Sequence, residues 1–125
     1  VHVTNLSMAC MHCGDPPCVE VCPTGAITKR DSDGLVVVDS NKCIGCHYCF
    51  FACPFGVPQY SDDGTMVKCD GCKDFLEIGK EPACAAVCFY GALYAGSLDE
   101  LAQIAAERNA RQLNASVQPF VLVLE

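Results

Sequence analysis

The protein has 125 residues, enough for one small domain, and lies close to the lower size limit at which an apolar core alone stabilises a fold. Its net charge of −7, with only eight Lys and Arg residues, argues against a surface that binds nucleic acid. Twelve cysteines predict a cross-linked or metal-bound scaffold. No apolar run reaches the roughly 20 residues of a membrane span and no signal-peptide pattern is present. Because the first residue is Val1 and not Met, we expect the natural protein to start upstream.

The first half of the sequence carries two cysteine quartets, each followed by proline. They are Cys10-x2-Cys13-x4-Cys18-x3-Cys22-Pro23 and Cys43-x2-Cys46-x2-Cys49-x3-Cys53-Pro54. The second spacing matches the bacterial ferredoxin run that binds [4Fe–4S] clusters, in which the last cysteine ligates the other cluster. A disulfide framework does not require this spacing, and a zinc site is expected to use separated, simple CxxC pairs.

The residues after each quartet repeat one pattern. A glycine lies three residues beyond the last cysteine, and an Asp-Gly hairpin signal follows at Asp33-Gly34 and at Asp63-Gly64. Residues 36–38 form an all-valine stretch, which is typical of a buried strand. The internal repeat of roughly 30 residues predicts an α+β fold. We expect a ferredoxin-like pseudo-twofold repeat of short helices and β-hairpins around [4Fe–4S] clusters.

The third quartet has wider spacing: Cys69-x2-Cys72, a gap of eleven residues, then Cys84-x3-Cys88. Taken alone, this spacing also fits a four-cysteine zinc site. The residues after Cys88 repeat the Gly-Ala-apolar tail that follows Cys22, although Phe89 replaces the proline. This favours the closing half of a third ferredoxin-type motif. Residues 74–78 predict one helical turn with Gly79 as its left-handed cap.

The C-terminal segment predicts an added helix and strand. Residues 97–113 have apolar side chains at helical spacing, and Ser97 with Glu100 forms a capping box. The sequence PFVLVLE over residues 119–125 is typical of a strand.

The three cysteine blocks together carry a family resemblance. CMHCGDPPCVEVCPTGAI, CIGCHYCFFACPFGVPQY and KCDGCKDFLEIGKEPACAAVC resemble consecutive blocks of the iron–sulphur electron-transfer subunit of the dimethyl sulphoxide reductase family. The resemblance covers roughly residues 5–100 and extends to similar subunits of formate dehydrogenases and polysulphide reductases. Members of this family carry four quartets and bind four [4Fe–4S] clusters. The N-terminal quartet is absent here, and the resemblance implies that it precedes Val1.

The resemblance also implies how the cysteines are shared between clusters. One cluster would be held by Cys10, Cys13, Cys18 and Cys53, and a second by Cys43, Cys46, Cys49 and Cys22. The third quartet, Cys69, Cys72, Cys84 and Cys88, would pair with the missing block. In this protein the third site has four alternatives: closure through Cys88, an outside ligand at one iron, zinc, or no occupant. The cofactor prediction is two [4Fe–4S] clusters, with the third site open between these alternatives.

Two histidines and three phenylalanines lie near the cysteines. His12 and His47 are expected to be surface or hydrogen-bonding residues, since the cysteines already supply four thiolates per cluster. Phe50, Phe51 and Phe55 are expected to be core residues that cover the clusters.

Three lysines, Lys42, Lys68 and Lys73, flank cysteines directly. A nearby cation favours the more negative, reduced cluster and so raises its potential. The alternative is that these lysines are ordinary solvated charges.

We expect three segments: a two-cluster ferredoxin module at 1–66, a third motif completing a truncated second module at 67–96, and a C-terminal extension at 97–125. The resemblance implies that the protein is not itself an enzyme. It would carry electrons between a quinol-oxidising membrane anchor subunit and a molybdopterin catalytic subunit. The implied location is prokaryotic and membrane-associated through those partners, on either face. The alternatives are a free ferredoxin-type carrier and a zinc-stabilised interaction module.

Overall fold

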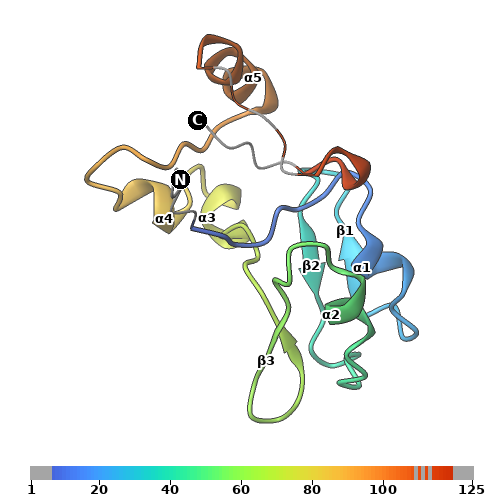
Figure 1. Cartoon of the computed structure of the whole chain (residues 1–125). Coiled ribbons are helices and arrows are strands. Elements are labelled where there is room, and N and C mark those ends of the chain that lie inside the picture. Colours follow the sequence, from blue (N-terminus) through green and yellow to red (C-terminus); the bar gives the residue numbers. More distant parts are fainter. Residues whose placement is uncertain (1–6, 109, 111, 113, 120–125) are drawn as a thin grey trace, which may run out of the picture.

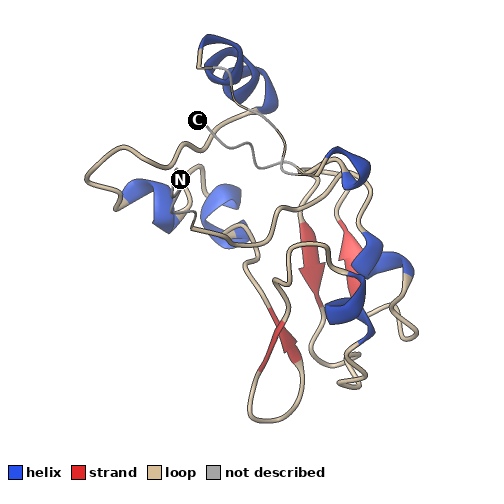
Figure 2. Ribbon diagram, viewed as in Figure 1, coloured by secondary structure: helices blue, strands red, loops and turns tan. Residues whose placement is uncertain are grey.

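The computed structural model describes residues 7–108, 110, 112 and 114–119. Short helices and two antiparallel two-stranded sheets make the fold α+β (Figures 1 and 2). The elements in sequence order are α1 (Pro17–Glu20), β1 (Ile27–Lys29), β2 (Val36–Val38), α2 (Tyr48–Ala52), β3 (Gln59–Tyr60), β4 (Met66–Val67), α3 (Lys73–Glu77), α4 (Ala83–Ala86), α5 (Leu98–Glu107) and the 3-10 turn η1 (Ala115–Val117). No helix among the described residues has the length and apolar character to cross a bilayer.

Both predicted hairpins are confirmed. In the first, β1 pairs with β2 so that Ile27 lies opposite Val38; in the second, Tyr60 of β3 lies opposite Met66 of β4. Each turn uses its aspartate in the same way. The Asp33 carboxylate accepts the N–H two residues later at 3.1 Å, and the Asp63 carboxylate does the same at 2.9 Å. Such side-chain-to-backbone bonds stabilise a tight turn, and the following glycine adopts positive φ.

The core lies between the hairpins and α2. Its buried members are Ile27, Val36, Cys49 and Met66. Of the predicted strand at residues 36–38, only Val36 is fully buried, and its two neighbours are half-buried. In Figure 1, α1 and α2 lie together beside the β1–β2 hairpin. Because Cys49 belongs to the core cluster, the apolar core and a cysteine-lined site share a wall.

The helical turn predicted at 74–78 is confirmed as α3. Gly79 follows it with φ of +73°. Its N–H donates to the Leu76 carbonyl at 3.0 Å, and the N–H of Lys80 donates to the Phe75 carbonyl at 2.8 Å. These two bonds are the Schellman pattern, which satisfies the free carbonyls at a helix end.

The predicted C-terminal helix begins where the sequence indicates, after Ser97, but it is shorter than predicted. The Ser97 hydroxyl accepts the Glu100 N–H at 3.3 Å, and the Glu100 carboxylate accepts the Ser97 N–H at 2.8 Å, which completes the capping box. The helix ends at Glu107, not at residue 113, and the Ala110 N–H turns back to the Ala105 carbonyl at 2.9 Å. The strand predicted at 119–125 lies outside the described residues, apart from Pro119.

Candidate metal centres

The three cysteine motifs start with the same loop. The third residue of each CxxC has positive φ: +42° at His12, +66° at Gly45 and +72° at Gly71. A Cβ at Gly45 would lie 2.6 Å from the carbonyl oxygen of Gly64, so this position has no room for a side chain. A left-handed residue inside a short loop turns successive N–H groups toward one side, which suits an anionic centre. In the first and third loops these N–H groups contact sulphur: His12 to Cys10 Sγ at 3.5 Å and Gly71 to Cys69 Sγ at 3.4 Å.

The motifs also end in the same way. The third cysteine of each quartet is the second residue of a short helix, on α1, α2 and α4. Three residues beyond the last cysteine, a glycine with positive φ donates its N–H back to that cysteine's carbonyl. These bonds are Gly25 to Cys22 at 3.4 Å, Gly56 to Cys53 at 3.3 Å and Gly91 to Cys88 at 3.1 Å. The third motif therefore keeps the ferredoxin-type ending although Phe89 replaces proline.

One cavity, called here the first cavity, gathers four cysteines from two motifs. Cys10, Cys13 and Cys18 come from the first motif and Cys53 from the second. The rest of its wall is mainly apolar, with Val36, Met66, Phe55, Val57 and Pro58 among the lining residues. Burial, followed by the neighbouring Cys10 thiol, raises the pKa of Cys18 to about 11 and also raises the pKa of Cys13. Thiols in this setting ionise readily only when a positive centre compensates them, as a metal cluster does.

A second cavity gathers the complementary set. Cys43, Cys46 and Cys49 of the second motif line it together with Cys22 of the first motif. The N–H of Met66 donates to Cys43 Sγ at 3.3 Å. Burial alone would raise the pKa of Cys22. Hydrogen bonds from backbone N–H groups, of which that of Ile27 has the largest effect, are stronger than this effect and lower the pKa. These hydrogen bonds favour a thiolate, the form that binds metal.

The donor sets fit [4Fe–4S] clusters in number and chemistry. Each of the two cavities brings four cysteines to a largely apolar wall, and all twelve cysteines are free thiols. A cubane takes one thiolate at each of four irons, and N–H···S contacts are among the interactions that tune it. Among the described residues, no group of three or more His, Cys, Asp or Glu side chains is arranged to hold a single metal ion.

The third quartet is more open than the other two. Cys69 and Cys84 are exposed, and Cys72 and Cys88 are half-buried. Cys88 Sγ accepts the N–H of Ala92 at 3.3 Å, and this bond, with others from the same turn, lowers the pKa of Cys88. Cys69 lines a cavity that also contains Cys10 of the first motif. The occupant of this third site stays a prediction.

The phenylalanine prediction is wrong for two of three residues. Phe50 and Phe51 are 42% and 81% exposed, because the five-residue helix α2 turns Cys49 inward and carries these rings on its other side. Phe55 lines the first cavity as expected.

The two histidines are hydrogen-bonding or stacking residues. His12 is buried, and its Nδ1 accepts the N–H of Val36 at 3.0 Å. Burial, with Lys68 as the next cause, lowers the pKa of His12 to about 4. The His47 ring stacks on Tyr60, with centroids 3.7 Å apart. The cysteine pattern does not predict a role for Tyr60 in this site. Its position in the strand after the second quartet is the one sequence feature that points to it.

The α+β fold and the two cysteine-lined cavities define a ferredoxin-like iron–sulphur protein. Residues 1–98 match the family model described as a 4Fe-4S dicluster domain, and the protein belongs to that family.

Relatives within this class are named as subunits of oxidoreductases. The protein is 55% identical over 97 residues to the B subunit of anaerobic dimethyl sulfoxide reductase of Escherichia coli (strain K12), a match that covers 77% of this sequence and 47% of the relative. It is 42% identical over 127 residues to the formate dehydrogenase iron-sulfur subunit of Wolinella succinogenes, covering 83% of this sequence and 63% of the relative. The protein thus spans about half the length of the first of these relatives.

Proposed function

We propose that this protein conducts single electrons through [4Fe–4S] clusters within a molybdopterin oxidoreductase complex. The observation that carries the proposal is the exchange of Cys22 and Cys53 between the two cavities, each of which receives three cysteines from one motif and one from the other. The clusters, when bound, supply the one-electron redox change. The protein's own residues hold them and limit the access of water.

The same geometry supports a finer ligand assignment. Cys10, Cys13, Cys18 and Cys53 hold the cluster of the first cavity, and Cys22, Cys43, Cys46 and Cys49 hold that of the second. The apolar wall of the first cavity lowers the local dielectric constant, so charges near it act more strongly than in water. The N–H groups that contact sulphur stabilise the negative charge of the reduced state.

The proposed partners are a molybdopterin catalytic subunit and a membrane anchor subunit that oxidises quinol. The relatives named as oxidoreductase subunits support this assignment. Phe89 and Tyr90 of the third motif are 99% and 97% exposed, and neighbouring large apolar side chains that face solvent mark interaction surfaces. A prokaryotic location at the membrane through these partners follows from the same proposal.

A free ferredoxin-type carrier is the second candidate. The net charge of −7 favours it, because an acidic surface steers a carrier to basic partners. Co-expression with a molybdopterin subunit separates the two candidates. A subunit forms a complex that survives gel filtration at high salt, whereas a charge-steered carrier dissociates under those conditions.

Iron analysis tests the proposal itself. Protein purified without oxygen should be brown, contain at least about eight irons per molecule for two cubanes, and give the electron paramagnetic resonance (EPR) signal of a reduced cluster after dithionite. A colourless, iron-free and fully folded protein from that preparation would contradict electron transfer and favour the zinc-stabilised alternative.

A further inference from the structure

The three lysines that flank cysteines differ in their ionic partners. Lys42 Nζ lies 3.6 Å from the Asp39 carboxylate, and Lys73 Nζ lies 3.4 Å from the carboxylates of Asp70 and Asp74. Lys68 makes no ion pair with any carboxylate in the part of the protein that the structure describes. Its positive charge is therefore the one in this set that no described carboxylate compensates at ion-pair distance.

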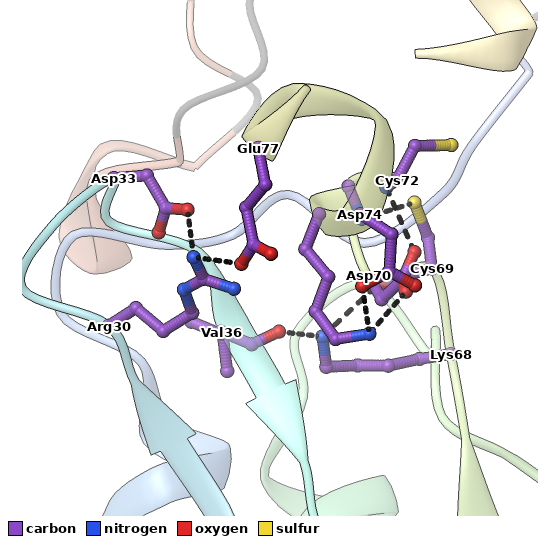
Figure 3. Close-up of polar contacts among 11 residues, drawn as sticks. Arg30, Asp33, Val36, Lys68, Cys69, Asp70, Cys72, Asp74 and Glu77 are labelled. Atoms are coloured by element: carbon purple, nitrogen blue, oxygen red, sulfur yellow. Dashed lines mark hydrogen bonds and ion pairs between the residues drawn. The ribbon is translucent and has the colours of Figure 1, made fainter. Parts of the chain in front are cut away.

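Lys68 is nevertheless held in place. Its ammonium group donates to the carbonyl oxygen of Val36 on β2 and to the carbonyl oxygen of Cys69, the latter at 3.0 Å (Figure 3). Val36 is only 1% exposed. Both acceptors are neutral, so they fix the position of the ammonium group without removing its charge.

The position that they fix is the wall of the first cavity. Lys68 and Val36 both line this cavity, together with the cysteines of the first motif and Cys53.

The second cavity differs in charge. Among the described residues, those that line it include no lysine or arginine. Lys42, which precedes Cys43 as Lys68 precedes Cys69, has a side chain that is 60% exposed and lies beside Asp39. The two Lys-Cys dipeptides therefore differ in the structure: the Lys68 side chain lines a cavity, whereas the Lys42 side chain is exposed beside a carboxylate.

We propose that Lys68 raises the reduction potential of the cluster held in the first cavity. The inference rests on the proposed function, since it requires a cluster there. Reduction adds one negative charge to the cluster, and a fixed positive charge at the cavity wall stabilises that form. Because the wall is largely apolar, solvent ions screen this interaction less than they screen an exposed pair.

An EPR-monitored redox titration of the full-length protein, purified without oxygen, tests this role. Lys68→Gln removes the charge and keeps an N–H donor, and Lys68→Met removes both. Each should lower the equilibrium constant for reduction of the first-cavity cluster by about tenfold, which is 59 mV for a one-electron couple. The second-cavity cluster should keep its potential. Lys68→Arg should stay close to the native value, because it keeps the charge.

Lys42→Met is the matched control, and neither midpoint should move. The first-cavity signal is identified as the one that Cys53→Ser removes. Native iron content with unchanged midpoints in both uncharged variants would overturn the inference and leave the proposed function intact. Loss of iron from both uncharged variants but not from Lys68→Arg would also overturn it, because Lys68 would then be a structural residue. Absence of clusters from the unsubstituted protein would instead overturn the proposed function.

Discussion

The hydroxyl of Tyr60 lies 3.3 Å from Sγ of Cys49, and this contact joins β3 to α2 across the second cavity. Burial and then the hydrogen bond with Cys49 raise the pKa of Tyr60, so the phenol stays protonated. The stacked His47 ring holds the phenol in position. A neutral phenol at this distance can donate to a thiolate, and it lies closer to its sulphur than the Thr24 hydroxyl of the same cavity, which is 3.7 Å from Cys22 Sγ.

We expect Tyr60→Phe to lower the potential of the second-cavity cluster. Loss of one hydrogen bond to a charged sulphur costs the reduced state about 1 kcal/mol, roughly a fivefold change in the equilibrium constant for reduction. Tyr48→Phe is the control, because Tyr48 precedes Cys49 but is 59% exposed. Redox titration followed by EPR measures both, and equal shifts in the two variants would refute a specific role for Tyr60.

Cys53→Ser should remove the cluster of the first cavity, although Cys53 lies in the second motif. Cys53 lines the first cavity and not the second, so its loss leaves Cys10, Cys13 and Cys18 without a fourth thiolate. Iron content should fall by up to about four per molecule.

Cys22→Ser is the reciprocal variant and should damage the cluster held by the second motif. EPR spectra of the two variants should therefore lose different signals. If each variant lost the cluster held by its own neighbours, the exchanged arrangement would be wrong.

Adding an N-terminal CxxCxxCxxxCP block should complete the third site. Two of its four thiols, Cys69 and Cys84, are exposed, against one of four in the second quartet, Cys46, and none in the first. Iron should rise from about eight toward about sixteen per molecule, since each cubane contributes four. The same block with its cysteines changed to serine should add none. A constant value near twelve would mean that the third quartet closes through Cys88.

Gly45→Ala should destabilise the protein more than Gly25→Ala. Both glycines have similar positive φ, +66° and +64°, so both substitutions carry the left-handed cost of about 1 to 2 kcal/mol. Only at Gly45 does the new Cβ meet the Gly64 carbonyl, 2.6 Å away, which adds about 1 to 3 kcal/mol. Anaerobic denaturant unfolding with clusters bound measures the difference, and equal midpoints would contradict it.

The features that the sequence predicts well are local. The Asp-Gly turns at Asp33 and Asp63 depend on one carboxylate that accepts a backbone N–H two residues away. The Ser97 capping box and the Gly79 cap depend on similarly short separations. Such bonds join residues that are close in the sequence, so the local pattern is sufficient to predict them here.

The features that the sequence predicts poorly depend on contacts between distant segments. The helix predicted at 97–113 ends instead at Glu107, and the Ala110 N–H that turns back to Ala105 is a backbone bond that side-chain spacing does not predict. Phe50 and Phe51 are apolar, but the side of α2 that is buried depends on the packing of Cys49 into the core cluster with residues of both hairpins. Lys42 and Lys68 are equivalent in sequence, and only the partners brought near by the fold distinguish them.

Because Cys53 lines the first cavity, the first cluster site is incomplete until the second motif has been synthesised. Cys10, Cys13 and Cys18 are translated well before Cys53. While the second motif is still being translated, the nascent polypeptide therefore carries three thiols of the first cavity without the fourth. Under the proposed ligation, neither cluster can be fully enclosed until both motifs have emerged. Iron delivery to the two sites is then coupled to translation of the second motif, and a product truncated before Cys43 would lack ligands for both clusters.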